Sequence, residues 1–246
     1  MSQAPSRKFL LVDGNSILYR AFYGSFSLVR AGEKNTNAVY TSIRMLRRII
    51  EKNGPFRGVL FFFDAGKETF RHQENSDYKG KRKKTPKELV SQLPIFKRFL
   101  QLLGIAFYED ARFEADDLLG SAATRLADSD YDVELLSGDR DLLQLVSPKV
   151  SLFLFKSGVN QMKRVADENF ERLFGFEPEA FLAFKTLVGD SSDNLPGVPG
   201  IGPKRALDLV KSFPTIEALY SNLGSLDKRS AEILESSREQ AFRMLR

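Results

Sequence analysis

Five consecutive apolar residues, 59–63, restrict the fold of this chain more than any other segment. A strand that is apolar on both faces has to be covered on both sides, as in a sheet that lies between layers of helices. Other strand-like runs occur at 9–12, 133–136 and 150–155. The chain therefore has the strands of a buried sheet distributed along its first two thirds.

The segments between these runs have the pattern of helices. Apolar residues recur at three- and four-residue spacing in 36–52, which predicts a helix with one apolar face. Further helices are expected at 89–103, 114–126, 178–188 and 203–212. Strands that alternate with helices indicate an α/β fold with a central, mostly parallel sheet flanked by helices.

Carboxylates gather where the apolar runs end. Because ligands of open α/β sheets bind beyond the carboxyl ends of the strands, Asp13, Asp64 and Asp139 are expected at one edge of the sheet. Nine acids form five clusters: Asp13; Asp64; Glu114, Asp116 and Asp117; Asp139 and Asp141; Asp190 and Asp193. Glu114 and Asp117 are spaced to share a helix face, and Asp139 and Asp141 would point the same way in extended chain.

The clusters together predict a metal site. Each one alone is better explained as a helix cap or a turn. Nine acids at one edge would repel one another unless divalent cations neutralised them. Oxygen ligands select Mg²⁺ or Mn²⁺ over zinc, and nine carboxylates exceed the need of one octahedral ion. Two or more ions are implied, and a pair of ions can promote phosphodiester hydrolysis.

Composition narrows the chemistry further. The chain has no cysteine and one histidine, His72, which excludes disulfides, thiol catalysis and multi-histidine metal sites. Lys and Arg total 37 against 32 acids, so metal binding to nine acids would leave a positive surface suited to a polyanion; lysine-rich solubility is the alternative. Residues 1–30 show no signal peptide or membrane span. We expect a cytoplasmic monomer without membrane association.

A basic segment follows the strand that ends at Asp64. Six cations fall within the nine residues 79–87, directly after an aromatic residue. Such runs are most often solvated faces, but the position beside an acidic cluster favours phosphate binding, with the Tyr78 ring available to an unpaired base. The candidate nucleic-acid contacts of this segment are Arg71, Tyr78, Lys79, Lys81, Arg82 and Lys83.

A glycine-rich turn at 197–204 precedes the helix expected at 203–212. Gly200 and Gly202 would leave backbone N–H groups exposed, and Lys204 and Arg205 lie in the first turn of the helix. A helix N-terminus with such cations can bind a phosphate. The alternative is a simple corner between two helices. With the helix at 178–188, the turn would form a hairpin that grips a DNA backbone without reading bases.

Seven motifs occur in order and carry a family resemblance. They are LVDGN (11–15), FFD (62–64), TFRH (69–72), YKGKR (78–82), EADD (114–117), SGDRD (137–141) and GDSSDNLPG (189–197). The set resembles the bacterial 5′-nuclease family, which comprises the N-terminal domain of DNA polymerase I, phage exonucleases and flap endonucleases. No polymerase segment follows, so we expect a free-standing nuclease or a fragment of a polymerase.

The resemblance implies a PIN-like core at 8–175 with a helical arch at about 66–95, and a helix-three-turn-helix region at 176–246. It implies that the nine acids bind metal and that Arg71, Lys79 and Arg82 contact phosphate from the arch. A K⁺ ion at the 197–204 turn is also implied. The expected substrates are flapped, nicked or gapped DNA and RNA–DNA primers of the nucleoid, cleaved by a two-metal-ion mechanism in replication and repair. A DNA polymerase or ligase is an expected partner.

Two other functions remain open on the sequence alone. A small-molecule phosphatase shares the strand–Asp–Gly pattern, but such enzymes typically carry a second acid two residues after the nucleophilic Asp, where this chain has Asn15. A non-catalytic protein that recognises branched DNA would use the metals only structurally. Turnover of a chromogenic phosphate monoester would indicate the first function, and an uncleaved flap in Mn²⁺ the second.

Overall fold

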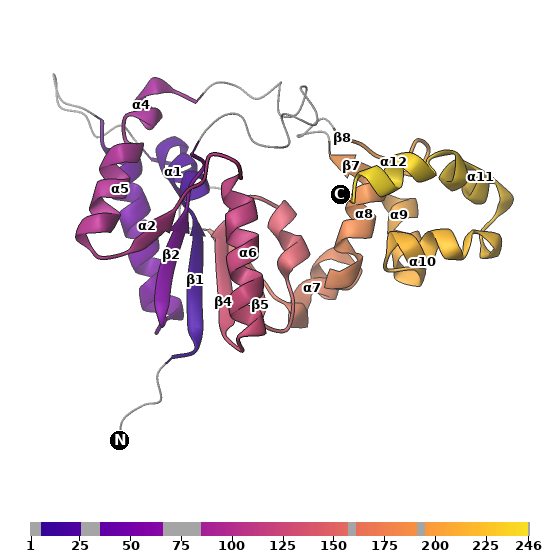
Figure 1. The fold of residues 1–246 in the computed structure, drawn as a ribbon, viewed down its shortest axis with the longest axis horizontal. Coiled ribbons are helices and arrows are strands. Elements are labelled where there is room, and N and C mark those ends of the chain that lie inside the picture. The colour runs from indigo at the N-terminus through magenta and orange to yellow at the C-terminus, as the bar shows by residue number, and fades with distance from the viewer. Residues whose placement is uncertain (1–5, 26–34, 66–84, 157–160, 191–194, 246) are drawn as a thin grey trace. The chain divides into compact units, whose positions relative to one another are not determined.

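A computed structural model of the chain describes residues 6–25, 35–65, 85–156, 161–190 and 195–245. Two compact units divide these residues, one up to Ala166 and the other from Asp167 onward (Figure 1). Most of the expected arch, residues 66–84, lies outside the described residues.

The first unit is built on a six-stranded sheet in the order β3-β2-β1-β4-β5-β6. Neighbouring strands are parallel, except that β6 is antiparallel to β5. The strands are β1 (Lys8–Asp13), β2 (Gly58–Phe62), β3 (Ala106–Tyr108), β4 (Asp132–Ser137), β5 (Val150–Phe155) and β6 (Met162–Val165). The predicted α/β fold with a mostly parallel sheet is confirmed, and the two edge strands β3 and β6 are additions to it.

Helices cover the sheet on both faces (Figure 1). The helices among the described residues of this unit are α1 (Gly14–Tyr23), α2 (Asn37–Asn53), α4 (Lys87–Val90), α5 (Leu93–Leu102) and α6 (Ala115–Asp128), and a 3-10 helix, η1 (Asp141–Leu145), follows β4. The single helix expected at 89–103 is wrong, because the chain turns at Ser91 and Gln92 between α4 and α5. Pro94, in the first turn of α5, has no N–H to continue a helix from residue 90.

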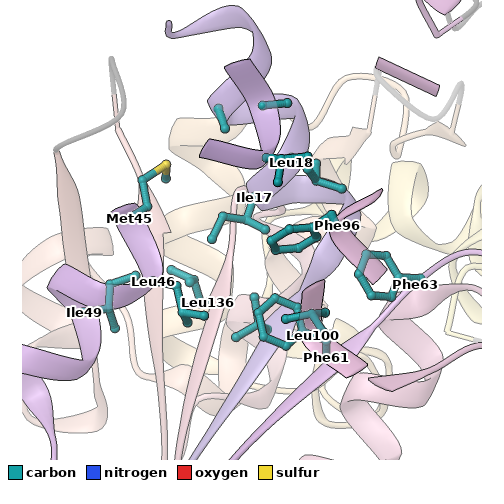
Figure 2. Packing of buried hydrophobic residues seen from close by; sticks show 14 of the residues in the cluster. Ile17, Leu18, Met45, Leu46, Ile49, Phe61, Phe63, Phe96, Leu100 and Leu136 are labelled. Carbon is teal, nitrogen blue, oxygen red and sulfur yellow. The ribbon is translucent and has the colours of Figure 1, made fainter. Parts of the chain in front are cut away.

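The apolar run 59–63 is buried on both sides, as its composition requires. Phe61 and Phe63 point into a core with residues of α1, α2 and α5, and Figure 2 shows both rings beside Phe96 and Leu100 of α5. Phe62 faces the opposite side, where α6 packs against β1, β2 and β4. Because Phe61 and Phe63 must both face this core, the end of β2 and the position of Asp64 directly after it are fixed.

The second unit is helical. Its helices are α7 (Asp167–Phe174), α8 (Phe181–Val188), α9 (Pro203–Ser212), α10 (Ile216–Ser221), α11 (Lys228–Ser236) and α12 (Arg238–Arg243), with short 3-10 turns η2 (Pro178–Ala180) and η3 (Leu223–Ser225). Two-residue strands β7 (Gly189–Asp190) and β8 (Leu195–Pro196) join α8 to the turn before α9. The helices expected at 178–188 and 203–212 are present, the first as η2 followed by α8.

No described helix combines the length and the apolar character that crossing a bilayer requires.

We expect Phe61→Ala to lower the free energy of unfolding by about 3–5 kcal/mol, because it leaves a cavity among fully buried side chains. Leu102→Ala is the matched control, since Leu102 is 69% exposed and its loss should change stability by less than about 0.5 kcal/mol. Urea unfolding followed by circular dichroism measures both. Equal losses in the two variants would contradict the described core.

Candidate metal centre at the edge of the sheet

Among the described acids of the predicted site, Asp13 is the most buried, with 6% of its surface exposed. It ends β1 and caps α1, and its Oδ1 accepts a hydrogen bond from the Ser16 N–H at 2.8 Å. Its Oδ2 accepts a hydrogen bond from the Ser137 hydroxyl, at the end of β4, at 2.7 Å. The carboxylate is therefore held in one orientation by α1 and β4 together.

Asp64 connects the same edge to the start of α6. Its Oδ1 accepts a hydrogen bond from the Ala115 N–H at 2.8 Å, and its Oδ2 accepts one from the Asn15 side-chain amide at 2.6 Å. The N-terminus of a helix carries unpaired N–H groups and a partial positive charge, which favour a carboxylate there. This contact brings Glu114 and Asp116, which flank Ala115, next to Asp64.

Asp117 lies in the first turn of α6. Its Oδ2 accepts a hydrogen bond from the Glu114 N–H at 3.0 Å. This is the capping-box arrangement, in which the third residue of a helix bonds the backbone of the N-cap residue. The predicted proximity of Glu114 and Asp117 is therefore present, and Asp117 has a structural task besides any role in metal binding.

The segment after β4 is folded tightly onto Ser137. The Asp139 N–H donates to the Ser137 hydroxyl at 3.0 Å, and the Asp141 N–H donates to Asp139 Oδ1 at 2.8 Å. Asp141 begins the 3-10 helix η1, so the expectation of extended chain at 139–141 is wrong. The physical reason is that Asp139 bonds its own backbone two residues on, which favours a turn.

Electrostatics links the strand-end acids. Burial raises the pKa of Asp13 to about 6; hydrogen bonds from Ser137 and Ser16 oppose this, and the negative charges of Asp64 and Asp139 add to it. A buried carboxylate near two others is a costly anion in protein alone. A divalent cation would relieve that cost, so the residues fit a hard metal.

One further oxygen at this edge is available to a metal ion, although the described acids are not arranged around one. Asn15 Oδ1 is buried and accepts no hydrogen bond from any described group, so it offers another oxygen at this edge. Within the described ranges, however, no three Asp, Glu or His side chains are arranged to hold a metal ion. Asp13 and Asp64 instead face protein donors with both oxygens. Metal binding by all nine acids remains a prediction.

The remaining site residues are distributed as follows. Asp190 belongs to the second unit, where its Oδ2 lies 2.7 Å from the Lys185 ammonium. Other predicted residues lie outside the described ranges; these are Asp193, Arg71, Tyr78, Lys79, Lys81, Arg82 and Lys83.

The predicted phosphate-binding turn has the backbone that its glycines suggested. Gly200 has φ +83, a left-handed conformation that favours glycine, and Gly202 caps α9, whose first turn contains Pro203. Lys204 is exposed. Arg205 is bonded to Asp227 at 3.0 Å and to Ser230, the cap and first turn of α11, so it braces α9 against α11.

Sequence reasoning named the acids but missed the groups that orient them. Ser16 and Ser137 were visible as hydroxyl residues beside Asp13 and Asp139, and the three-residue spacing of Asp13 and Ser16 is that of a helix cap. Their mutual positions depend on β1 and β4 being neighbours.

Two family models match the chain along its length. The family model of the N-terminal, resolvase-like domain of 5′-3′ exonucleases matches residues 8–175, and that of their C-terminal SAM fold matches residues 176–246. The chain belongs to the 5′-3′ exonuclease family. This confirms the predicted family and the predicted class of enzyme, a 5′-3′ nuclease.

Individual relatives agree with the family. A 5′-3′ exonuclease of Mycoplasma pneumoniae is 40% identical over 237 residues, which are 94% of this chain and 81% of that protein. DNA polymerase I of Bacillus caldotenax is 39% identical over 237 residues, 96% of this chain but 27% of the polymerase. The chain thus spans about a quarter of the polymerases it matches.

A solved structure shares the fold of the exonuclease chain. The flap endonuclease of bacteriophage T5, in a complex with DNA and metal ions, has a TM-score of 0.75 at 23% identity, over 97% of this chain and 87% of the T5 protein.

We expect Asp13→Asn to raise the free energy of unfolding in EDTA at neutral pH by about 1–3 kcal/mol, because it removes a buried charge. The Asn oxygen can still accept from the Ser16 N–H, and its NH₂ group can donate to the Ser137 hydroxyl. Urea unfolding measures the change, with the exposed Asp128→Asn as the control. A stability below that of the wild type would show that the charge itself stabilises the fold.

Proposed function

We propose that this 5′-3′ exonuclease family member is a structure-specific nuclease that cleaves phosphodiesters near the 5′ end of flapped, nicked or gapped DNA and RNA–DNA primers. The observation that supports it is the hydrogen-bonded convergence of Asp13, Asp64 and the α6 N-terminus at the carboxyl edge of the sheet. An acidic edge in a chain of net charge +5 suits a polyanion delivered to bound cations.

The proposed cofactors are two or more Mg²⁺ or Mn²⁺ ions. Asp13, Asp64, Glu114 and Asp116 would hold the first ion most tightly; Asp139, Asp141, Asp190 and Asp193 would favour the second, with Asp117 between them or in the outer shell. Bound ions of this kind supply Lewis acidity to phosphoryl oxygens and lower the pKa of a water nucleophile. The protein presents Asp13 to the site already oriented, since Ser137 and the α1 N-terminus fix its two oxygens.

Substrate contacts are proposed on both units. Arg71, Lys79 and Arg82 would neutralise the scissile phosphate, and an unpaired base would stack on Tyr78. The exposed N-terminus of α9, with Lys204 and Arg205, would bind the duplex backbone, and carbonyl groups of the 197–204 turn would bind K⁺. Gln240 already bonds one of these carbonyls, Gly197 O, together with the preceding Pro196 O, so the ion would use later carbonyls of the turn.

The biological setting is proposed from the same family. The relatives named DNA polymerase I support a role in replication and repair, in which a polymerase or a ligase would act at the same nick. We propose a monomer that acts on nucleoid DNA, with a nuclease core at 8–175 and a duplex-binding region at 176–246.

We expect Asp116→Ala to reduce flap cleavage to below about one hundredth of the wild-type rate while flap binding stays largely intact, because the ligand is lost but the DNA contacts remain. A 5′-labelled double-flap DNA with Mg²⁺, beside an EDTA reaction, measures release of the flap as a short oligomer. Asp128→Ala, an exposed acid on the same helix, is the matched control and should cleave normally.

The outcomes separate the proposal from its alternative. A near-normal rate for Asp116→Ala at saturating Mg²⁺ would refute the role of Asp116. Binding without cleavage by the wild type, in Mg²⁺ and in Mn²⁺, would indicate a branched-DNA receptor instead.

We also expect Lys79→Ala to slow single-turnover cleavage by about a hundredfold, while it weakens flap binding much less, because its charge acts on the phosphate at the transition state. Lys52→Ala, an exposed lysine in α2 outside the basic segment, is the control. Equal losses of rate and affinity would show that Lys79 only binds DNA.

A further inference from the structure

Two strands of the second unit bring two backbone segments into close contact. β7 and β8 pair antiparallel, with Gly189 opposite Pro196 and Asp190 opposite Leu195. A Cβ at Gly189 would lie 2.2 Å from the Gly197 nitrogen, and a Cβ at Gly197 would lie 2.3 Å from the Val188 carbonyl carbon. Because only glycine permits this approach, the backbone of residues 195–197 packs directly against the backbone that carries Asp190.

A side chain from the C-terminal helix holds the outer strand of this pair. Gln240 of α12 donates its Nε2 hydrogens to Pro196 O at 2.8 Å and to Gly197 O at 3.1 Å. These residues are more than 40 positions earlier in the chain, and α12 lies beside β7 and β8 in Figure 1. On the other side, the Val198 N–H donates to Leu187 O of α8 at 2.9 Å. The segment 196–198 is thus bonded to α12 and to α8.

The helix that carries Gln240 is itself anchored. Phe242 packs against Tyr220 of α10 with ring centroids 5.3 Å apart, and the Arg238 guanidinium lies over the same Tyr220 ring at 4.8 Å. The Tyr220 hydroxyl donates to Leu234 O of α11 at 2.9 Å. A donor on such an anchored helix is preorganised, so its hydrogen bonds restrict residues 196–197 more than those of a donor on a mobile segment would.

Residue order gives this contact a functional meaning. Asp190, a proposed metal ligand, lies on β7, and the proposed duplex-binding turn at 197–204 begins where the Gln240 bonds end. The Lys185 ammonium lies 2.7 Å from the Asp190 carboxylate, whereas the Asp190 backbone is held by its pairing with Leu195. The side chain and the backbone of Asp190 are therefore held by different contacts. The pair of Gln240 hydrogen bonds, which we call the Gln240 clamp, therefore holds backbone next to both the proposed metal ligand and the proposed duplex-binding turn.

We propose that Gln240 is a positioning residue that couples the metal ligand Asp190 to the duplex-binding turn by bonding the backbone carbonyls of Pro196 and Gly197. This inference rests on the proposed nuclease function for its kinetic consequence and on the geometry alone for its structural one. The residue touches neither substrate nor metal; it acts through the loop.

The first experiment measures hydrogen exchange of the full chain without metal or DNA. Gln240→Met keeps the length of the side chain and removes the donor, and we expect exchange of the Val198 amide to speed up by about threefold to tenfold, as for the loss of one net hydrogen bond. Gln240→Lys restores a donor and should return exchange toward the wild-type rate. Arg243→Met, an exposed side chain on the same helix, is the control and should leave it unchanged.

The second experiment measures flap cleavage and flap binding in the same variants. In Gln240→Met we expect the Mg²⁺ concentration for half-maximal single-turnover rate to rise, and the affinity for the duplex arm to fall, each by about threefold to tenfold. Asp190→Asn should change only the first quantity, and Lys204→Ala only the second. The joint loss, reversed in Gln240→Lys, is the expected signature of a residue that positions both.

The outcomes distinguish this inference from the proposed function. Unchanged exchange in Gln240→Met overturns the clamp, even if the enzyme cleaves flaps. Faster exchange that Gln240→Lys does not reverse, or that extends through α9 and α10, shows a general packing role and also overturns it. If exchange in Gln240→Met speeds up only at residues 196–198 while the wild-type protein cleaves no flap, the positioning role of Gln240 is supported and the proposed nuclease function is rejected.

Discussion

The two hydrogen bonds of the Asp13 carboxylate are the interaction on which the site depends. They join the end of β1, the start of α1 and the end of β4, so the first acid of the edge is oriented before any cation binds. The cost is a buried anion, seen in the raised pKa of Asp13. The buried charge lowers the stability of the fold, and the apolar packing of the sheet beneath Asp13 offsets that loss.

The same logic extends outward from Asp13. Asp64 lies where β2 leaves the sheet, and its position follows from the burial of Phe61 and Phe63 on one face of the strand. Asp64 accepts a hydrogen bond from an N–H group of α6, whose first turn carries Asp116 and Asp117 and whose cap is Glu114. The Ser137 hydroxyl donates to the Asp13 carboxylate and accepts from the Asp139 N–H, so one side chain holds both an acid and the backbone that carries another.

The helical unit uses a different constraint for a comparable purpose. There the backbone is fixed by close approach, since Gly189 and Gly197 leave no room for a side chain. Gln240 adds a clamp from the last helix. In this unit the C-terminal helices therefore hold the backbone that carries Asp190 and the turn for which we propose phosphate binding.

The sequence by itself determined the α/β class, the strands near 9–12, 59–63 and 133–136, and the nuclease family, because hydrophobic periodicity and contiguous motifs are local. It did not reveal the edge strands: β3 has three residues, and β6 is mostly exposed or half-buried. Only the tertiary structure decided how the acids are oriented and what holds them. The local caps, such as that of Ser16 on Asp13, lie three positions apart and follow a known pattern. The Ser137 bond to Asp13 and the Gln240 bond to Gly197 join residues 124 and 43 positions apart, and no local pattern encodes such pairs.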